Sequence, residues 1–233
     1  MYNPLELSKK TEKIVSNGVL KKYYRFRPTG FYGGIATADT VGCNLRCAFC
    51  WSGNSVWNAN NTGEFYSSQE VAKNLQEIAL KKRYRQLRVS GGEPTIGRMH
   101  LIKLLENIQT QFLFILETNG LILGYDKTYV EDLSKFSNLH VRVCLKGSNA
   151  EEFTWLTGAE VGFKYQMKAL EFLHDQKMSF NIAIVTVKGN KSALFDKLKD
   201  MDLGQVMIEE EEITLYPLVK NRLKQKGMLK YFM

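Results

Sequence analysis

The sequence predicts an α/β fold in which short strands alternate with helices along one chain. Apolar segments with strand character recur, each followed by a segment of helical periodicity, in about six units over ~190 residues. Glycine-containing turns follow several of these strands. Strands and helices that alternate in this way form a parallel sheet with right-handed crossovers. The 233 residues are enough for one sizeable core, so we expect a single folded unit.

The first two units are the most sharply defined. Residues 33–40 are suited to a strand that leads into a cysteine-containing loop. Residues 67–83 predict a helix, because Ser67 and Glu70 have the spacing of a capping box and the following apolar residues recur on one face. Residues 86–90 alternate like a strand and end at the turn Gly-Gly-Glu-Pro-Thr.

The pattern continues to the C-terminal region. The predicted helices are 99–110, 129–136, 160–176 and 191–201, and the predicted strands are 111–117, 139–147, 179–189 and 205–217. In barrels of parallel strands the chemistry lies at the C-terminal ends of the strands. We therefore expect the cysteine loop and the turns GGEPT, ETNG and LKGS to meet at one end of the sheet.

Composition limits the setting of the protein. Apolar residues make up 44% and charged residues 24% of the chain, as in ordinary globular proteins. No apolar run approaches the ~18 residues of a membrane span, and the polar N-terminal segment does not resemble a signal peptide. The chain has 4 cysteines, and three of them lie close together, whereas a secreted disulfide framework would scatter an even number along a shorter chain. We expect a reducing, cytoplasmic setting and no membrane partner.

Three of the cysteines, Cys43, Cys47 and Cys50, lie within one short loop. Zinc would need a fourth ligand, and neither Cys144 nor the histidines His100, His140 and His174 have suitable spacing. A redox pair would leave Cys43 without a role, and the polar residues between the cysteines argue against simple burial. The remaining option is an iron–sulfur cluster in which three cysteines leave one iron open.

The spacing Cys-x3-Cys-x2-Cys, with Phe49 before the last cysteine, resembles the motif of the radical S-adenosylmethionine (radical SAM) superfamily. The resemblance implies a partial (βα)6 TIM-type barrel over 33–220, with an N-terminal extension at 1–32 and a basic tail at 221–233. It also implies a 4Fe–4S cluster held by the three cysteines. In this family the reduced cluster cleaves S-adenosylmethionine to a 5′-deoxyadenosyl radical, which abstracts hydrogen from a substrate.

The same resemblance assigns roles near the cofactor. The GGE-type motif of the family holds the methionyl amino group, and the TNG turn lies near the cofactor. Phe49 and Trp51 would flank the adenine, although core packing is an alternative for Trp51. A lysine at the end of the fourth strand is a candidate for the cofactor's carboxylate. The matching residues are Gly91, Gly92, Glu93, Thr118, Asn119 and Lys146.

Residues 145–173 resemble the corresponding segment of glycyl-radical-enzyme activating proteins, in which a lysine precedes a short loop and a Leu-Thr-Gly element. This implies radical generation on a partner protein, with an electron donor such as a flavodoxin or ferredoxin. The chain departs from that pattern at Cys144, where an aspartate is usual, and in having no histidine after the last strand.

Two alternatives remain open at this level. The net charge of +8, with aromatic residues among the basic ones near both ends, permits RNA or a nucleobase-derived substrate. A non-catalytic iron–sulfur or zinc protein would make the glycine-containing turns coincidental. The roles of Cys144 and of the four glutamates 209–212 are undecided, but strand alternation would turn two of those glutamates toward the barrel mouth.

Overall fold

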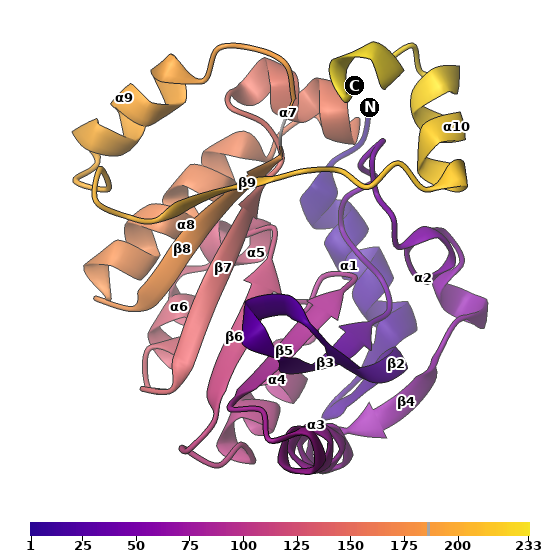
Figure 1. The fold of residues 1–233 in the computed structure, drawn as a ribbon, viewed down its shortest axis with the longest axis vertical. Helices are drawn as coiled ribbons and strands as arrows, with labels where there is room; N and C mark the ends of the chain where they lie inside the picture. The colour runs from indigo at the N-terminus through magenta and orange to yellow at the C-terminus, as the bar shows by residue number, and fades with distance from the viewer. Residues whose placement is uncertain (186) are drawn as a thin grey trace.

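The computed structural model describes residues 1–185 and 187–233 and contains one mixed sheet (Figure 1). Its strand order is β1-β2-β3-β5-β6-β7-β8-β9, and β4 pairs with β2 off this path. The strands are β1 (Ser16–Asn17), β2 (Leu20–Thr29), β3 (Ile35–Thr40), β4 (Glu64–Ser67), β5 (Gln86–Gly91), β6 (Leu113–Thr118), β7 (Leu139–Leu145), β8 (Ser179–Val185) and β9 (Ile208–Glu211).

The predicted fold class is confirmed. Strands β3, β5, β6, β7, β8 and β9 pair in parallel and in chain order, which is the arrangement of a partial (βα)6 barrel. The sheet is open, because its path ends at β1 on one side and at β9 on the other. Figure 1 shows these strands fanning across the molecule, with α5, α6 and α8 along one side of β7 and β8.

Ten α-helices connect or flank the strands in the described residues. They are α1 (Pro4–Val15), α2 (Gly53–Trp57), α3 (Ser68–Lys82), α4 (Arg98–Glu106), α5 (Leu121–Tyr125), α6 (Lys127–Leu133), α7 (Ala150–Thr157), α8 (Phe163–Asp175), α9 (Ser192–Asp200) and α10 (Pro217–Gln225). The capping box at Ser67 and Glu70 is confirmed as the start of α3. Across 1–185 and 187–233, no helix has both the length and the apolar character that crossing a bilayer requires.

Several elements differ from their predicted extents. The strand predicted over 205–217 is limited to β9, because this edge strand pairs with β8 over only four positions, from Ile208 to Glu211. One position of the strand predicted over 179–189, residue 186, lies outside the described residues. The segment expected to be a loop and a turn after Lys146 contains helix α7, which Asn149 caps and Gly158 ends.

The segment 1–32 contributes α1 and β2, neither of which the sequence predicted. Strand β2 pairs antiparallel with β3 from Tyr23↔Thr40 to Thr29↔Ile35, so it extends the sheet directly beside the first parallel strand. Its alternating burial places Lys21 and Tyr23 on the buried side of the strand. This position of β2 brings an N-terminal lysine close to the predicted cofactor turns.

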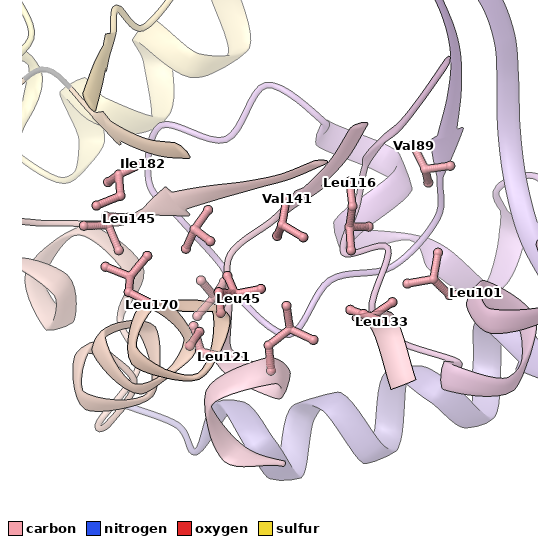
Figure 2. Packing of buried hydrophobic residues seen from close by; sticks show 14 of the residues in the cluster. Leu45, Val89, Leu101, Leu116, Leu121, Leu133, Val141, Leu145, Leu170 and Ile182 are labelled. Atoms are coloured by element: carbon pink, nitrogen blue, oxygen red, sulfur yellow. The ribbon is translucent and has the colours of Figure 1, made fainter. Parts of the chain in front are cut away.

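One face of the sheet is covered by helices and forms the apolar core. Figure 2 shows side chains from the strands, such as Leu116 and Val141, packed near Leu121 and Leu170 from the helices. Leu45 of the cysteine loop reaches the same core and is only 2% exposed. Leu45 lies between Cys43 and Cys47 in the sequence. Because its side chain is buried in the core, apolar packing anchors the cysteine loop on the sheet.

The opposite face of the sheet carries a network of charged side chains. Arg88 on β5 lies 3.0 Å from a carboxylate oxygen of Glu117 on β6. Arg142 on β7 pairs with Glu209 and Glu211 on β9 at 2.9 and 3.4 Å. The attraction between opposite charges offsets part of the free energy that is lost when each is removed from water. The interior face of the open barrel is therefore polar, whereas its outer face is apolar.

The anchoring of the cysteine loop by Leu45 gives a stability prediction. Leu45→Ala is expected to lower the free energy of unfolding by about 2–5 kcal/mol, because it removes a fully packed side chain and leaves a cavity. Leu80→Ala is the matched control, since Leu80 is 61% exposed. Urea unfolding of both variants measures the difference, and equal values for the two would contradict the packing described here.

Candidate active site

The predicted functional loops all follow neighbouring parallel strands. The cysteine loop follows β3, the GGEPT turn ends β5, the ETNG turn ends β6, and Lys146 follows β7. These strands are adjacent and in register, so that Thr40 pairs with Gly91 and Thr118 with Val143. The C-terminal ends of four consecutive strands therefore bring these loops to one edge of the sheet, as the sequence predicted.

Backbone hydrogen bonds hold the cysteine loop in shape. The backbone N–H of Leu45 donates to Sγ of Cys43 at 3.3 Å, and that of Cys50 donates to the carbonyl of Cys47 at 3.1 Å. The guanidinium of Arg46 donates to the carbonyls of Cys43 and Leu45 at 2.7 and 2.9 Å. Arg46 is thus tied to the loop backbone rather than extended into solvent.

The three thiols are free and largely removed from solvent. Burial raises the pKa of Cys47 to about 12, although Lys146 opposes this rise. Burial also raises the pKa of Cys43 and of Cys50. Thiols of this kind lose their protons when a cationic centre binds them. The loop therefore offers three sulfur ligands in a setting that favours metal-bound thiolates over free ones.

The three sulfurs do not form a site for a single ion. Within residues 1–185 and 187–233, no group of three or more His, Cys, Asp or Glu side chains is arranged to hold one metal ion. Tetrahedral zinc needs four ligands that converge on one point. A 4Fe–4S cluster binds each cysteine through a different iron, so its ligands need not converge. The donor set fits a cluster better than zinc.

Gly91 and Gly92 bring the GGEPT turn against the cysteine loop. Gly91 has φ of +92°, and a Cβ atom on Gly92 would lie 2.1 Å from the carbonyl oxygen of Gly42. The backbone N–H of Glu93 donates to that same carbonyl at 2.7 Å, and Gly92 donates to Thr40 at 2.9 Å. The structure therefore requires glycine here for contact between two backbone segments.

The carboxylate of Glu93 is turned into the protein and joins two turns. Its Oε1 accepts hydrogen bonds from the backbone and hydroxyl of Thr95 and from the hydroxyl of Thr118, at 3.1, 2.7 and 2.7 Å. Its Oε2 accepts from the backbone N–H of Asn119 at 2.8 Å. The side chain is 1% exposed. In this arrangement Glu93 connects the GGEPT turn to the ETNG turn.

Lys21 of β2 supports the GGEPT turn, a role that sequence reasoning missed. Its Nζ donates to the carbonyls of Glu93 and Pro94 at 3.1 and 2.8 Å, and also to that of Ile96. The protonated amine has three N–H donors, one for each carbonyl, and the neutral amine keeps two of them. Alternation in a basic segment was the available signal, since it places Lys21 on the buried side of β2.

Asn119 and Gln166 provide further hydrogen bonds that join the ends of β6 and β7 to each other and to the cysteine loop. The side chain of Asn119 donates to Oδ1 of Asn44 at 2.8 Å, which links the ETNG turn to the cysteine loop. Gln166 of α8 donates to the carbonyls of Asn119 and Cys144 at 2.6 and 3.1 Å and accepts from the N–H of Lys146 at 3.1 Å. The four strand ends thus form one hydrogen-bonded unit.

The remaining predicted residues lie around the cysteine loop. Phe49 is buried, its ring is 5.9 Å from that of Phe232, and Nζ of Lys146 is 5.8 Å from its centre. Trp51 is 50% exposed, so the alternative of core packing is wrong for this residue. Thr118 is buried and donates to Glu93. An aromatic ring and a lysine therefore meet beside the cysteine loop.

Both ends of the chain contact the cysteine loop, which the sequence did not reveal. The hydroxyl of Tyr2 accepts from the N–H of Arg46 at 2.7 Å. Arg222 of α10 donates to the carbonyls of Cys50 and Ala48 at 2.7 and 3.3 Å, and its guanidinium lies 4.3 Å from the ring of Trp57. Figure 1 shows α10 beside α2, which contains this tryptophan.

The glutamates after β8 follow the expected alternation. Glu209 and Glu211 turn toward Arg142, whereas Glu210 lies 3.6 Å from Lys191. The inward pair thus shares one arginine of the chain itself. Cys144 is buried, and Arg142 lies 3.3 Å from its sulfur.

A family model for the radical SAM superfamily matches residues 38–201. The chain belongs to this superfamily. Residues 38–201 include the cysteine loop, the glycine-containing turns and Lys146. Members use a 4Fe–4S cluster and S-adenosylmethionine, so these are the cofactors of this enzyme. Membership in a family of enzymes sets aside the alternative of a non-catalytic iron–sulfur or zinc protein.

Three named proteins are similar to this chain. A GTP 3′,8-cyclase from Thermodesulfovibrio yellowstonii is 26% identical over an alignment of 223 residues, and the match covers 82% of this chain and 67% of that protein. The crystal structure of Streptococcus suis SuiB bound to precursor peptide SuiA has a TM-score of 0.61 at 18% identity and covers 83% of this chain and 46% of SuiB. Native anSMEcpe with bound AdoMet gives a TM-score of 0.52 at 17% identity, over 82% of this chain and 57% of anSMEcpe. This radical SAM chain thus spans about half of the structural relatives.

The close approach of the two backbones at Gly92 gives a prediction for the radical SAM site. Gly92→Ala is expected to displace the GGEPT turn from the cysteine loop, because the added Cβ would overlap the carbonyl of Gly42. Cofactor cleavage should fall at least about tenfold, the loss that misplaced groups around a reacting centre commonly cause. Gly30→Ala is the control, since nothing lies within 4 Å of its added Cβ and its φ is −82°. Equal activity of both variants would show that the approach is not required.

The burial of Lys21 predicts a pH-dependent stability. Burial lowers the pKa of Lys21 from 10.5 to about 7, although Glu93, Glu12 and Cys43 oppose the shift. Between these two values the unfolded chain carries a proton that the folded protein does not. The free energy of unfolding is therefore expected to rise with pH in this window, by up to ~1.4 kcal/mol per pH unit from this group.

The measurement is urea unfolding across that window for the wild type, Lys21→Met and Lys73→Met. Lys73 is a suitable control because its side chain is 73% exposed. Lys21→Met should lose this part of the pH dependence, whereas Lys73→Met should keep it. The same slope in all three proteins would contradict the assignment.

Proposed function

We propose that this radical SAM enzyme generates a radical on a partner protein, with Cys43, Cys47 and Cys50 as the ligands of the cluster. When bound, the reduced cluster supplies the electron that splits S-adenosylmethionine into methionine and a 5′-deoxyadenosyl radical, which abstracts a hydrogen atom. The observation that carries the proposal is the hydrogen-bonded unit of four adjacent strand ends. It joins the sulfur ligands to the turns that would receive the cofactor.

Within this proposal the GGEPT turn receives the methionyl amino group through its backbone. The carboxylate of Glu93 already accepts four hydrogen bonds from Thr95, Thr118 and Asn119. It is therefore better suited to positioning the turn than to binding a ligand amine. Gly91 and Gly92 keep the turn close to the cysteine loop. One cofactor molecule could then contact the turn with its amino group and also bind the open iron.

The other cofactor contacts follow from charge and shape. Lys146 follows the end of β7, and its Nζ lies 5.8 Å from the ring centre of Phe49. Its position and charge suit it to the cofactor's carboxylate. Phe49 and the half-exposed Trp51 are candidates to flank the adenine. Asn119 and Thr118 would hold the ETNG turn against the site, since both are bonded to Glu93.

The choice of a protein substrate rests on the segment after β7 and on the open sheet. Residues 145–173 resemble the corresponding part of activating proteins for glycyl radical enzymes. The sheet ends at β9, and its inner face is lined by paired charges such as Arg142 with Glu209. An open, polar face is suited to a segment of polypeptide that enters from one side.

A nucleotide or RNA substrate is the second candidate. It is favoured by the 26% identity to a protein named GTP 3′,8-cyclase and by the basic C-terminal segment. The two candidates separate experimentally, because a nucleotide substrate would be altered without any partner protein.

The proposal includes the setting and the organisation of the chain. The four free cysteines suit a reducing, cytoplasmic compartment, in which a flavodoxin or ferredoxin could donate electrons. We keep 33–220 as the catalytic core, 1–32 as its N-terminal extension and 221–233 as a basic tail. Tyr2 and Arg222, which contact the cysteine loop from outside this core, support the view that the flanking segments stabilise the site.

The test begins with anaerobic reconstitution with iron and sulfide, chemical reduction and addition of S-adenosylmethionine. We expect 5′-deoxyadenosine from the wild type and none above background from Cys47→Ala, while Cys144→Ala keeps its cluster. With a candidate glycyl radical enzyme present, the partner should acquire an organic radical signal. Formation of the nucleoside with consumption of GTP and no radical on a partner would favour the second candidate.

A further inference from the structure

Asn44 of the cysteine loop has a buried amide nitrogen without a hydrogen-bond partner. The residue is 0% exposed, and its Nδ2 is the one buried side-chain nitrogen or oxygen that lacks a partner in the described part of the chain. Buried polar groups are almost always paired, because leaving a donor unmet is unfavourable. An unmet donor of this kind indicates that an acceptor belongs beside it.

The orientation of this amide follows from its neighbours. The backbone N–H of Leu121 donates to Oδ1 of Asn119 at 3.1 Å, which fixes the oxygen of that side chain. Nδ2 of Asn119 therefore donates to the remaining polar atom, Oδ1 of Asn44, at 2.8 Å. Exchanging oxygen and nitrogen in Asn44 would set two N–H groups against each other. The unpaired atom of Asn44 is thus its donor.

The amide group that carries the unpaired donor lies beside the first sulfur ligand. Sγ of Cys43 is 3.9 Å from Oδ1 of Asn44 and 3.9 Å from Nδ2 of Asn119. Asn44 follows Cys43 directly, and the same loop holds all three cysteines. The amide of Asn44 therefore lies beside a proposed ligand of the cluster, and its N–H donor has no acceptor there.

We propose that the Nδ2–H of Asn44 donates a hydrogen bond to a sulfur of the bound 4Fe–4S cluster and raises its reduction potential. This inference rests on the proposed ligand set. The acceptor is a sulfide of the cluster next to Cys43, which is an anionic sulfur. Because the reduced cluster carries one more negative charge, an N–H donor stabilises it more than the oxidised form. Asn44 is a positioning and tuning residue and does not touch the reacting carbon.

Asn119 makes this hydrogen bond responsive to the ETNG turn. It holds Oδ1 of Asn44 through its own amide, and its backbone N–H is held by Glu93. A shift of the ETNG turn would therefore turn the amide of Asn44 relative to the cluster. Asn119→Ala removes this support but leaves the donor in place, so it should change the potential less than Asn44→Ala does.

The experiment measures the midpoint potential of the reconstituted cluster without S-adenosylmethionine, by an EPR-monitored titration with dithionite. Asn44→Ala should retain about four irons per chain. At the wild-type midpoint, its ratio of reduced to oxidised cluster should fall about tenfold, which is ~59 mV for a one-electron couple. Asn44→Asp keeps the acceptor for Asn119 but loses the donor, and it should also titrate at a lower potential. Asn60→Asp introduces the same charge at an exposed position and should leave the potential unchanged.

A second readout does not depend on variants that assemble fully. Wild-type protein labelled with 15N in the asparagine side chains should show a hyperfine coupling of the reduced cluster to an amide nitrogen. The coupling should persist in Asn60→Asp and weaken in Asn44→Ala. Because Nδ2 of Asn119 also lies 3.9 Å from Sγ of Cys43, the spectrum of Asn119→Ala decides the source if Asn44→Ala loses its iron. A coupling that persists in Asn119→Ala supports the proposal, and its loss there overturns it.

Two outcomes would overturn the inference alone. One is a midpoint potential in Asn44→Ala that equals the wild-type value with the cluster intact. The other is a labelled wild type with no amide coupling, which would assign the donor to an ordered water. Failure of the wild type to hold iron would instead overturn the ligand set on which the proposed function rests.

Discussion

The buried carboxylate of Glu93 is the interaction on which the candidate site depends. It binds the hydroxyl of Thr118 and the backbone of Asn119, so the ends of β5 and β6 move as one piece. The carbonyl of the same residue accepts from Lys21, which brings a buried amine from the antiparallel strand β2 to the turn. A charge removed from water is tolerable when hydrogen bonds surround it, and here the surrounding donors are the parts of the site itself.

The two faces of the open barrel differ in their role: one packs against the helices and the other carries charged side chains. The outer face of the sheet is apolar and takes the helices, together with Leu45 from the cysteine loop. The inner face is polar and carries ion pairs such as Arg88 with Glu117. The cysteine loop is therefore fixed from the apolar side, while the polar side remains available for the cofactor and a substrate. In the proposed function, the radical SAM chemistry of the family lies at the boundary between the two.

The sequence was sufficient for the parts of this arrangement that are local. The capping box at Ser67 predicted the start of α3, and the order of cysteine loop, GGEPT turn and ETNG turn predicted their meeting at one end of the sheet. It was insufficient where a side chain acts across the fold. Lys21 and Arg222 are distant in sequence from the turns that they support, and each resembles an ordinary surface cation until tertiary packing buries or docks it.

The central claim is that the three thiols and the linked turns form one site in which a cluster keeps an open iron for S-adenosylmethionine. The most direct measurement is the EPR spectrum of the anaerobically reconstituted, reduced protein before and after the cofactor is added. The account predicts a signal of a reduced 4Fe–4S cluster whose g values shift when S-adenosylmethionine binds. A cluster signal that the cofactor does not change, or zinc in place of iron in protein prepared without air, would contradict it.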